Sequence, residues 1–395
     1  MQQEKYGIKD SYFWRISLSL AFASFFVFAG IYVVQPILPL FVREFNISVS
    51  EATLTLSVTI IGLISGLIIL GFFSDRKGRV TIMKYSLIAG VIPFLLIPIL
   101  ESFYLFVFLR FIQGFALAGL PATALAYINE EIKSTNVGIA TALYISSNAL
   151  GGMVGRVLAG YLTESYSWQT VFYTFAGMGV IVVILVFLLL PTSRFFQPSR
   201  LPFRKDIEGM LYHFKNPAIL LIIGMGVVLQ FSFTSIWTYL PFHLEGEPYN
   251  LSVQTISYTF FAYGFGVVGA PIAGWLAGHL GLRPVRMFGF IVLSFGILIT
   301  LNTSLSMIII GLCVSCLGFF TAHSLTSSTV AEEATHHKGS ASSLYLVAYY
   351  IGVTLGSTAS GPIWQLGGWN TVVLVAGVVP IAYLAIVRLY QWRKA

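Results

Sequence analysis

The chain has 395 residues, of which 57% are hydrophobic and only 9% are charged. Ordinary soluble domains carry about 25% charged residues, so this composition excludes a soluble globular protein and indicates a polytopic membrane protein. The net charge of +7 does not indicate nucleic-acid binding, because the cations lie in short segments between long apolar runs. We therefore expect the lipid bilayer, and no nucleic acid, as the partner of this chain.

In chain order, twelve apolar segments approach or exceed the length of about 20 residues that a helix needs to cross a bilayer. They are too long to be strands of a transmembrane barrel, and a helix satisfies its own backbone hydrogen bonds in lipid. We therefore predict an all-α membrane protein with twelve transmembrane helices. The expected spans are 14–42, 51–72, 80–100, 103–129, 136–162, 170–190, 218–242, 254–277, 287–302, 305–331, 341–364 and 370–390.

Lysine and arginine fall on one side of these spans. With a cytoplasmic N-terminus, Arg43 is the only cation in an outer loop, and the remaining ones outside the spans lie in inner segments. Cytoplasmic loops are enriched in Lys and Arg. This bias predicts an even number of spans in the cell membrane, with both termini cytoplasmic.

The chain divides into two similar halves. The longest hydrophilic stretch, 191–217, is the expected cytoplasmic linker between an N-terminal bundle, 1–190, and a C-terminal bundle, 218–395. A parallel repeat of this kind predicts two pseudo-symmetric six-helix bundles with a substrate path between them. A shift of 201 residues aligns Gly138 with Gly339, Tyr144 with Tyr345, Gly151 with Gly352, Gly155 with Gly356, Gly160 with Gly361 and Trp168 with Trp369.

A charged loop interrupts the apolar sequence between the second and third expected spans. It has the sequence Gly-Phe-Phe-Ser-Asp-Arg-Lys-Gly-Arg, from Gly71 to Arg79, and it has a counterpart without the Asp at 274–281. Glycine permits a tight turn there. One explanation of the loop is that its cations serve merely as topology signals. Asp75 adds nothing to such a signal, so its presence favours a conformational latch. The expected latch residues are Gly71, Asp75, Arg76, Gly78 and Arg79.

Two motifs carry a resemblance to a known family. The loop 71–79 is similar to the signature between spans two and three of the major facilitator superfamily, and Arg110-Phe-Ile-Gln113-Gly114 resembles the Arg-x-x-Gln-Gly signature of its proton-linked efflux members. The resemblance covers essentially the whole chain. It implies that Asp75 receives hydrogen bonds at a helix N-terminus of the opposite half, which favours closure of the inner face.

Other segments resemble one branch of that family and differ from another. The segment around His323, with Tyr345 and Tyr349, most resembles the YnfM-type efflux permeases. The segment from Asn148 to Arg156 lacks the Pro of the family's antiporter motif and adds the Arg. The branch implies a proton-coupled exporter.

Two arginines, Arg110 and Arg156, lie in the interior of expected spans, away from the span ends. A charged side chain at mid-membrane costs at least about 2.5 kcal/mol, so Arg110 is expected to face the interior with a partner. It can bind substrate or relay protons, with Gln113 one turn away on the same face, or it can bond to carbonyls of the first span. Arg156 can bind substrate, bond to a carbonyl or extend toward the outer surface.

Acidic residues are absent from the middle of every expected span. The titratable group suited to proton exchange near neutral pH is therefore His323, in the tenth span; the alternative is a hydrogen-bonded interior histidine. Two buried cations without a buried acid predict an anionic or zwitterionic substrate. The expected substrate and proton pathway consists of Gln35, Arg110, Gln113, Asn148, Arg156, Gln230, His323, Tyr345 and Tyr349.

We expect no metal and no cofactor other than the proton. Cys313 and Cys316 have metal-like spacing, but they lie in an apolar run and are better explained as small buried hydrophobes. His323 and Ser324 are adjacent and point to different helix faces, which disfavours a catalytic pair. The predicted protein is not an enzyme.

The sequence thus predicts a monomeric secondary transporter for small molecules that works by alternating access. Proton-coupled efflux is the favoured direction, on the resemblance alone. One alternative is an exporter of an anionic or zwitterionic metabolite, such as an amino-acid-derived or metal-chelating compound. The alternative of another class is a membrane sensor that binds a ligand without moving it.

Overall fold

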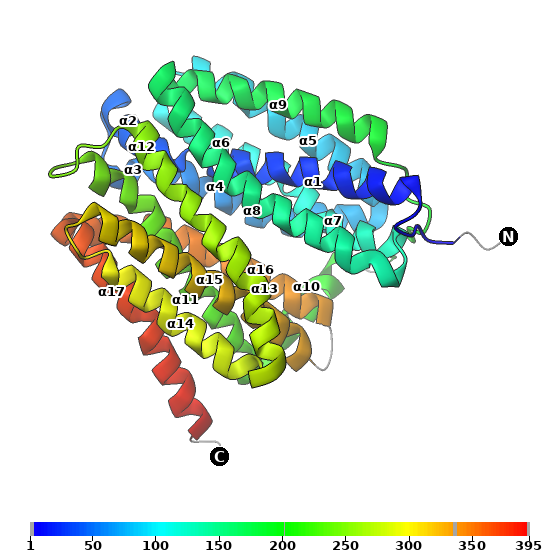
Figure 1. The fold of residues 1–395 in the computed structure, drawn as a ribbon. Helices are drawn as coiled ribbons and strands as arrows, with labels where there is room; N and C mark the ends of the chain where they lie inside the picture. The colour runs from blue at the N-terminus through cyan, green and yellow to red at the C-terminus, as the bar shows by residue number, and fades with distance from the viewer. Residues whose placement is uncertain (1–3, 201, 335–337, 393–395) are drawn as a thin grey trace. The chain divides into compact units, whose positions relative to one another are not determined.

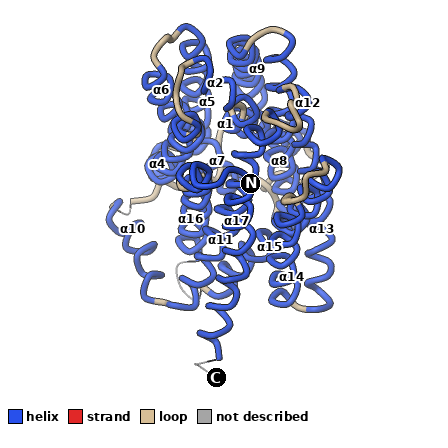
Figure 2. Tube along the Cα trace, turned by 90° about the vertical axis from the view of Figure 1, so that its left-hand side faces the viewer, coloured by secondary structure: helices blue, strands red, loops and turns tan. Residues whose placement is uncertain are grey.

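The computed structural model describes residues 4–200, 202–334 and 338–392. Over these ranges the chain forms α-helices and short 3-10 helices joined by loops (Figures 1 and 2). Tyr6 and Ile132 form an isolated β-bridge, and no strand forms in the described ranges. The predicted all-α class is confirmed.

The chain forms two compact units. One contains residues 1–37, 43–46 and 54–200, and the other contains 38–42, 47–53 and 201–395. The short segment 47–53 belongs to the second unit, within which Gln365 donates to Ser50 Oγ at 3.3 Å.

Several spans of the N-terminal unit consist of more than one helical segment. The first span breaks around Pro36, and the fourth breaks at Ala118. The elements are α1 (Ser11–Tyr32), η1 (Gln35–Ile37), α2 (Leu38–Glu44), α3 (Val49–Ala52), α4 (Leu54–Lys77), α5 (Arg79–Leu96), η2 (Ile97–Ile99), α6 (Phe103–Leu117), α7 (Gly119–Glu131), α8 (Ser134–Ser165) and α9 (Trp168–Leu189); α2 contributes to both units, and α3 belongs to the second.

The stretch 191–217, which was predicted as a hydrophilic linker, contains a helix, α10 (Phe203–Tyr212), for which the sequence analysis made no prediction. The elements of the C-terminal unit are α10, η3 (His213–Lys215), α11 (Pro217–Glu245), α12 (Val253–Tyr258), η4 (Thr259–Ala262), α13 (Tyr263–Leu280), α14 (Leu282–Ile299), α15 (Leu305–Glu333), α16 (Lys338–Thr358) and α17 (Ser360–Trp392).

Eleven helical segments of the described chain are long and apolar enough to cross a membrane. The remaining expected span, 341–364, coincides mainly with α16, whose 21 residues correspond to about 31 Å of helix. Its many Ser, Thr and Tyr residues make it less apolar than the others. The next turn follows at Gly367 and Gly368, whose non-helical backbone separates the two parts of α17.

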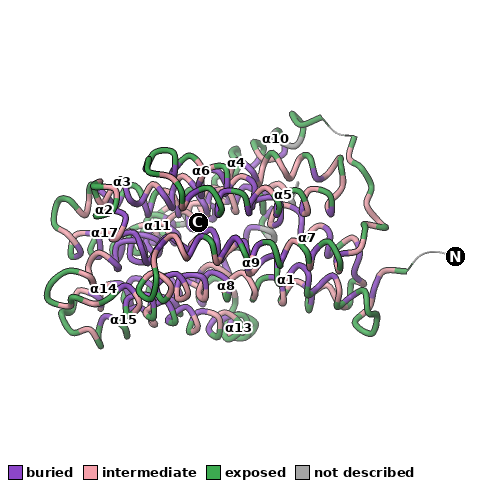
Figure 3. The backbone as a smooth tube through the Cα atoms, turned by 90° about the horizontal axis from the view of Figure 1, so that it is seen from above, coloured by how far each residue is buried: buried purple, intermediate pink, exposed green. Residues whose placement is uncertain are grey.

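The repeat is visible in the helix pairs of each unit. Helix α1 packs on α8 as α11 packs on α16, and α4 packs on α6 as α13 packs on α15. A Cβ on Gly155 would lie 2.7 Å from Ala29 Cα, and one on Gly356 would lie 2.6 Å from the Phe231 carbonyl oxygen. These glycines therefore permit close helix contact. Buried and exposed residues alternate along the helices, because each presents one face to its neighbours (Figure 3).

Candidate functional site

The loop between α4 and α5 turns at Gly78. Its φ of 105° lies in the left-handed region that favours glycine, and its counterpart Gly281 has a φ of 88°. Arg76 folds back, donates to the Phe72 carbonyl at 2.9 Å and lies 3.5 Å from the Phe72 ring centroid. Gly71 has only ordinary van der Waals space around it. Glycine is therefore required at Gly78, where the chain turns, and not at Gly71.

Arg79 connects the loop to the end of α7. Its guanidinium donates to Asp75 and, at 3.0 Å, to Glu130 Oε1. The sequence prediction missed Glu130, because nothing in the local pattern marks a partner 51 residues away. Asp75 also accepts a hydrogen bond from the Ser199 amide through its main-chain oxygen, at 2.8 Å. Its predicted contact with the opposite half stays a prediction.

Arg110 belongs to α6, and its side chain lies against the C-terminal end of α1. The side chain is fully buried and donates to the carbonyls of Gly30 at 3.0 Å, Ile31 at 2.6 Å and Thr55 at 3.1 Å. Carbonyls in the last turn of a helix have no intrahelical partner, and α1 ends at Tyr32. Arg110 therefore caps α1 and ties it to α4, as the carbonyl-bonding alternative anticipated.

Gln113 extends this connection. Its Oε1 accepts from Arg110 at 2.5 Å, and its Nε2 donates to the Gly90 carbonyl of α5 at 3.4 Å. Both side chains are fully buried. The pair thus links four spans of the N-terminal unit by hydrogen bonds.

Arg156 faces the place where the first span breaks. It donates to Gln35 Oε1 at 2.6 Å and to the Gly152 carbonyl at 2.6 Å, and its guanidinium lies 4.2 Å from the centroid of the Tyr32 ring. The residue is 3% exposed, so the alternative of extension to the outer surface is wrong. The sequence-predicted residues Gln35 and Arg156 are thus in direct contact.

Asn148 lies two turns before Arg156 on α8. The Tyr144 hydroxyl lies beside Asn148 and Ser24, while Asn148 Oδ1 is buried and has no hydrogen-bond partner in the described chain. A buried acceptor without a partner costs about 1–3 kcal/mol. Asn148 Oδ1 is therefore available to a ligand or a water molecule.

The C-terminal unit carries an aromatic cluster around His323. His323 Nδ1 and the Tyr345 hydroxyl are 2.9 Å apart, the Phe319 ring stacks on the imidazole, and the Tyr349 centroid lies 4.6 Å away. Tyr345 and Tyr349 occupy the repeat positions of Tyr144 and Asn148. Equivalent helices of the two units thus present polar side chains at equivalent positions.

Arg286 is an interior cation that sequence reasoning assigned to a loop. The ninth span was expected to start at residue 287, but α14 begins at Leu282 and places Arg286 inside the helix with 6% exposure. It donates to Thr329 Oγ1 at 2.7 Å and interacts electrostatically with Tyr345.

Gln230 and the two cysteines lie in the same unit. Gln230 on α11 is 4% exposed, and its Oε1 has no hydrogen-bond partner among the described residues. Neither Cys313 nor Cys316 forms a disulfide. No group of three or more His, Cys, Asp or Glu side chains in the described ranges could hold a metal ion.

Comparison with other proteins gives the family. The profile of the Major Facilitator Superfamily matches residues 20–357 and 222–395. The chain is 34% identical over 361 residues to the uncharacterized MFS-type transporter YybF of Bacillus subtilis (strain 168), covering 91% of this chain and 89% of that protein. It is 33% identical over 380 residues to the inner membrane transport protein YnfM of Escherichia coli (strain K12), covering 96% and 91%.

A more distant relative and a solved structure complete the comparison. The cis,cis-muconate transport protein of Acinetobacter baylyi (strain ATCC 33305 / BD413 / ADP1) is 29% identical over 296 residues, covering 71% of this chain and 70% of that protein. The crystal structure of a D-xylose-proton symporter shares the fold, with a TM-score of 0.78 and 16% identity over 95% of this chain and 97% of that one. The prediction of a transporter rather than an enzyme is confirmed by this family. The chain is a multi-pass membrane protein that belongs to the Major Facilitator Superfamily.

Proposed function

We propose that this transporter exports an anionic or zwitterionic small molecule across the cytoplasmic membrane in exchange for protons, by alternating access. The proposal includes a monomeric protein with both termini in the cytoplasm. The distribution of Lys and Arg supports that orientation, since cytoplasmic segments are enriched in cations.

The observation that carries the proposed substrate charge is the position of Arg156. This guanidinium is almost fully buried and lies against the amide of Gln35 and the ring of Tyr32. No acidic residue occurs in the middle of any expected span. An arginine binds carboxylates and phosphates with two parallel N–H groups, so a negatively charged substrate group would match it. The unpartnered Oδ1 of Asn148 adds an acceptor for a substrate amine or hydroxyl.

A relative supports the same chemistry. The cis,cis-muconate transport protein is named for a dicarboxylate, and it aligns over 71% of this chain. Muconate itself is therefore the first anion to test, alongside other carboxylates.

The proposed coupling group is His323. An imidazole can change charge near neutral pH, and its Nδ1 is within hydrogen-bond distance of Tyr345. In the tautomer whose neutral Nδ1 accepts from the Tyr345 hydroxyl, protonation of His323 would make Nδ1 the donor. Such a switch would link a proton to the arrangement of α15 and α16.

The test uses purified protein in liposomes with an imposed pH gradient. A panel of cis,cis-muconate, an amino acid and a lipophilic cation is compared in the wild type, Arg156→Gln and Arg156→Lys. We expect carboxylate transport that falls at least tenfold in Arg156→Gln and is partly kept in Arg156→Lys. Transport of the cation alone, unchanged by either substitution, would refute the proposed substrate class.

A further inference from the structure

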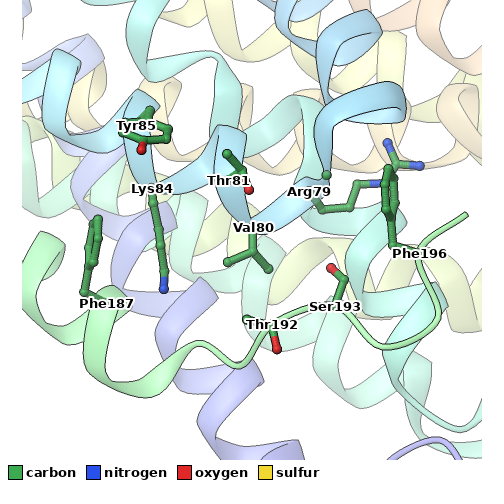
Figure 4. A pocket seen from close by; sticks show the side chains of 10 residues that line it. Arg79, Val80, Thr81, Lys84, Tyr85, Phe187, Thr192, Ser193 and Phe196 are labelled. Atoms are coloured by element: carbon green, nitrogen blue, oxygen red, sulfur yellow. The ribbon is translucent and has the colours of Figure 1, made fainter. Parts of the chain in front are cut away.

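A cavity of about 390 Å³ lies beside the start of α5, between that helix, the end of α9 and the chain that follows α9 (Figure 4). It is well separated in sequence from Arg156 and His323. The described lining contains no acidic residue and includes Arg79, Thr81, Lys84, Phe187, Ser193 and Phe196.

The charged side chains that line this cavity are cations, and its hydroxyl groups can donate hydrogen bonds. Lys84 forms no ion pair in the described chain, and its Nζ lies 4.7 Å from the centroid of the Phe187 ring. Ser193 Oγ is buried without a hydrogen-bond partner in the same ranges. Arg79 adds a second positive charge, although it is shared with Asp75 and Glu130. The combination fits an anion.

The start of α5 adds to this positive character. Its N-cap is Gly78, which provides no side-chain cap, and the first intrahelical bond is donated by Ile82. The amides of residues 79–81 are therefore the unbonded first-turn donors of a helix N-terminus, where anions are stabilised. These amides, Lys84 and Ser193 lie around one cavity.

The chain that forms one wall is held in place. The Tyr127 hydroxyl donates to the Pro191 carbonyl at 2.7 Å, and the fully buried Glu131 accepts from the amides of Arg194 at 2.6 Å and Phe195 at 3.1 Å. Because these bonds flank Ser193 on both sides, the cavity is formed before any ligand binds.

An apolar, outward-facing surface adjoins the cavity. On α5, Tyr85 is 68%, Ile88 39% and Ile92 49% exposed, and on α9, Phe187 is 47% and Ile184 51% exposed. Helices α5 and α9 pack on each other. In a membrane-spanning unit such residues face lipid tails, so a ligand can combine an anionic group in the cavity with an apolar body along these helices.

We propose that the cavity binds the phosphate headgroup of an anionic phospholipid, whose acyl chains lie along α5 and α9. Basic pockets between transmembrane helices near the cytoplasmic surface suit such headgroups. The site goes beyond the proposed function, because it requires neither a substrate nor a proton. A free phosphate has the same charged group but would not use the apolar surface.

The test measures lipid binding to the purified full chain by native mass spectrometry. Phosphatidylglycerol and phosphatidylcholine are titrated against the wild type, Lys84→Gln and Lys77→Gln. Lys77 is the matched control, because it is a lysine at the end of α4, seven residues before Lys84, and lies against the Phe73 ring without lining the cavity. We expect tighter binding of phosphatidylglycerol and a loss of about fivefold in Lys84→Gln, since one basic residue near the surface contributes about 1 kcal/mol.

Ser193→Ala provides a second variant that keeps every charge, and it should weaken phosphatidylglycerol binding without affecting phosphatidylcholine. Equal losses in Lys84→Gln and Lys77→Gln would overturn the proposal in favour of unspecific attraction to a basic face. Displacement of phosphatidylglycerol by millimolar inorganic phosphate would instead identify a free-anion site and would also overturn the lipid assignment.

Discussion

The Arg79 guanidinium bridges Asp75, four residues before it, and Glu130 at the end of α7, with a distance of 3.0 Å to Glu130 Oε1. The bridge joins the loop after the second span to the end of the fourth. It makes the charged loop part of a structure within the N-terminal unit, in addition to any role it has toward the other half. Arg79 is thereby held in one orientation by two carboxylates.

Asp75→Asn should impair transport and leave folding intact. The Asp75 side chain is 41% exposed, and exposed ion pairs contribute at most about 1 kcal/mol to stability. Transport should fall severalfold because the loop loses the charge that holds Arg79. The measurements are transport in liposomes and thermal unfolding in detergent. Loss of expression or of the folded protein would instead assign the loop a structural role.

Glu130→Gln tests the other end of the bridge. If the bridge acts as one unit, Glu130→Gln should lower transport to a similar extent, and the double variant with Asp75→Asn should be little worse than either single variant. Multiplicative losses would show that the two carboxylates act separately. Glu4→Gln is a matched control, because Glu4 pairs with Lys133 outside this bridge.

Arg110→Met should destabilise the N-terminal unit strongly. The substitution removes the donors for the carbonyls of Gly30, Ile31 and Thr55, and a lost partner for a buried polar group costs about 1–3 kcal/mol. Thermal unfolding should therefore shift to lower temperature. Substrate should still protect whatever folded variant remains. A folded variant of normal stability that no longer binds substrate would assign Arg110 to the binding site instead.

Much of the fold follows from the sequence, since long apolar runs must be helices in lipid. The turn at Gly78 and its repeat at Gly281 were predictable, because the loop motif and its glycine recur at a fixed spacing. The polar composition of α16 still permitted its recognition as a span, because its length and its place in the repeat compensate for its lower apolarity.

The partners of the buried cations were much harder to predict. The groups that satisfy Arg110 include three main-chain carbonyls, which every residue carries and no pattern marks. Arg286 was expected to precede the ninth span, because a charged residue near a span end is naturally assigned to the loop, whereas α14 begins at Leu282 and includes it. Contacts such as Arg79 with Glu130 depend on tertiary packing.

His323→Gln should abolish transport driven by a pH gradient while leaving substrate exchange without a gradient. Glutamine can still hydrogen-bond to Tyr345 but cannot take up a proton, so it separates the proposed coupling from the contact seen at 2.9 Å. Tyr345→Phe is the complementary control, because it removes the contact and keeps the imidazole. Uphill transport that persists unchanged in His323→Gln would exclude coupling through this residue.

The repeated glycines permit a test in which the repeat supplies its own control. A Cβ on Gly155 would lie 2.7 Å from Ala29 Cα, whereas one on Gly138 would have nothing within 4 Å, although both residues belong to the repeat. Gly155→Ala should therefore separate α1 from α8 and cost about 1–3 kcal/mol, as overpacking usually does. Gly138→Ala should be neutral or stabilising by up to about 1 kcal/mol, since alanine favours a helix. Thermal unfolding of the two variants checks this contrast, and equal effects would show that the close contact of α1 and α8 does not explain Gly155.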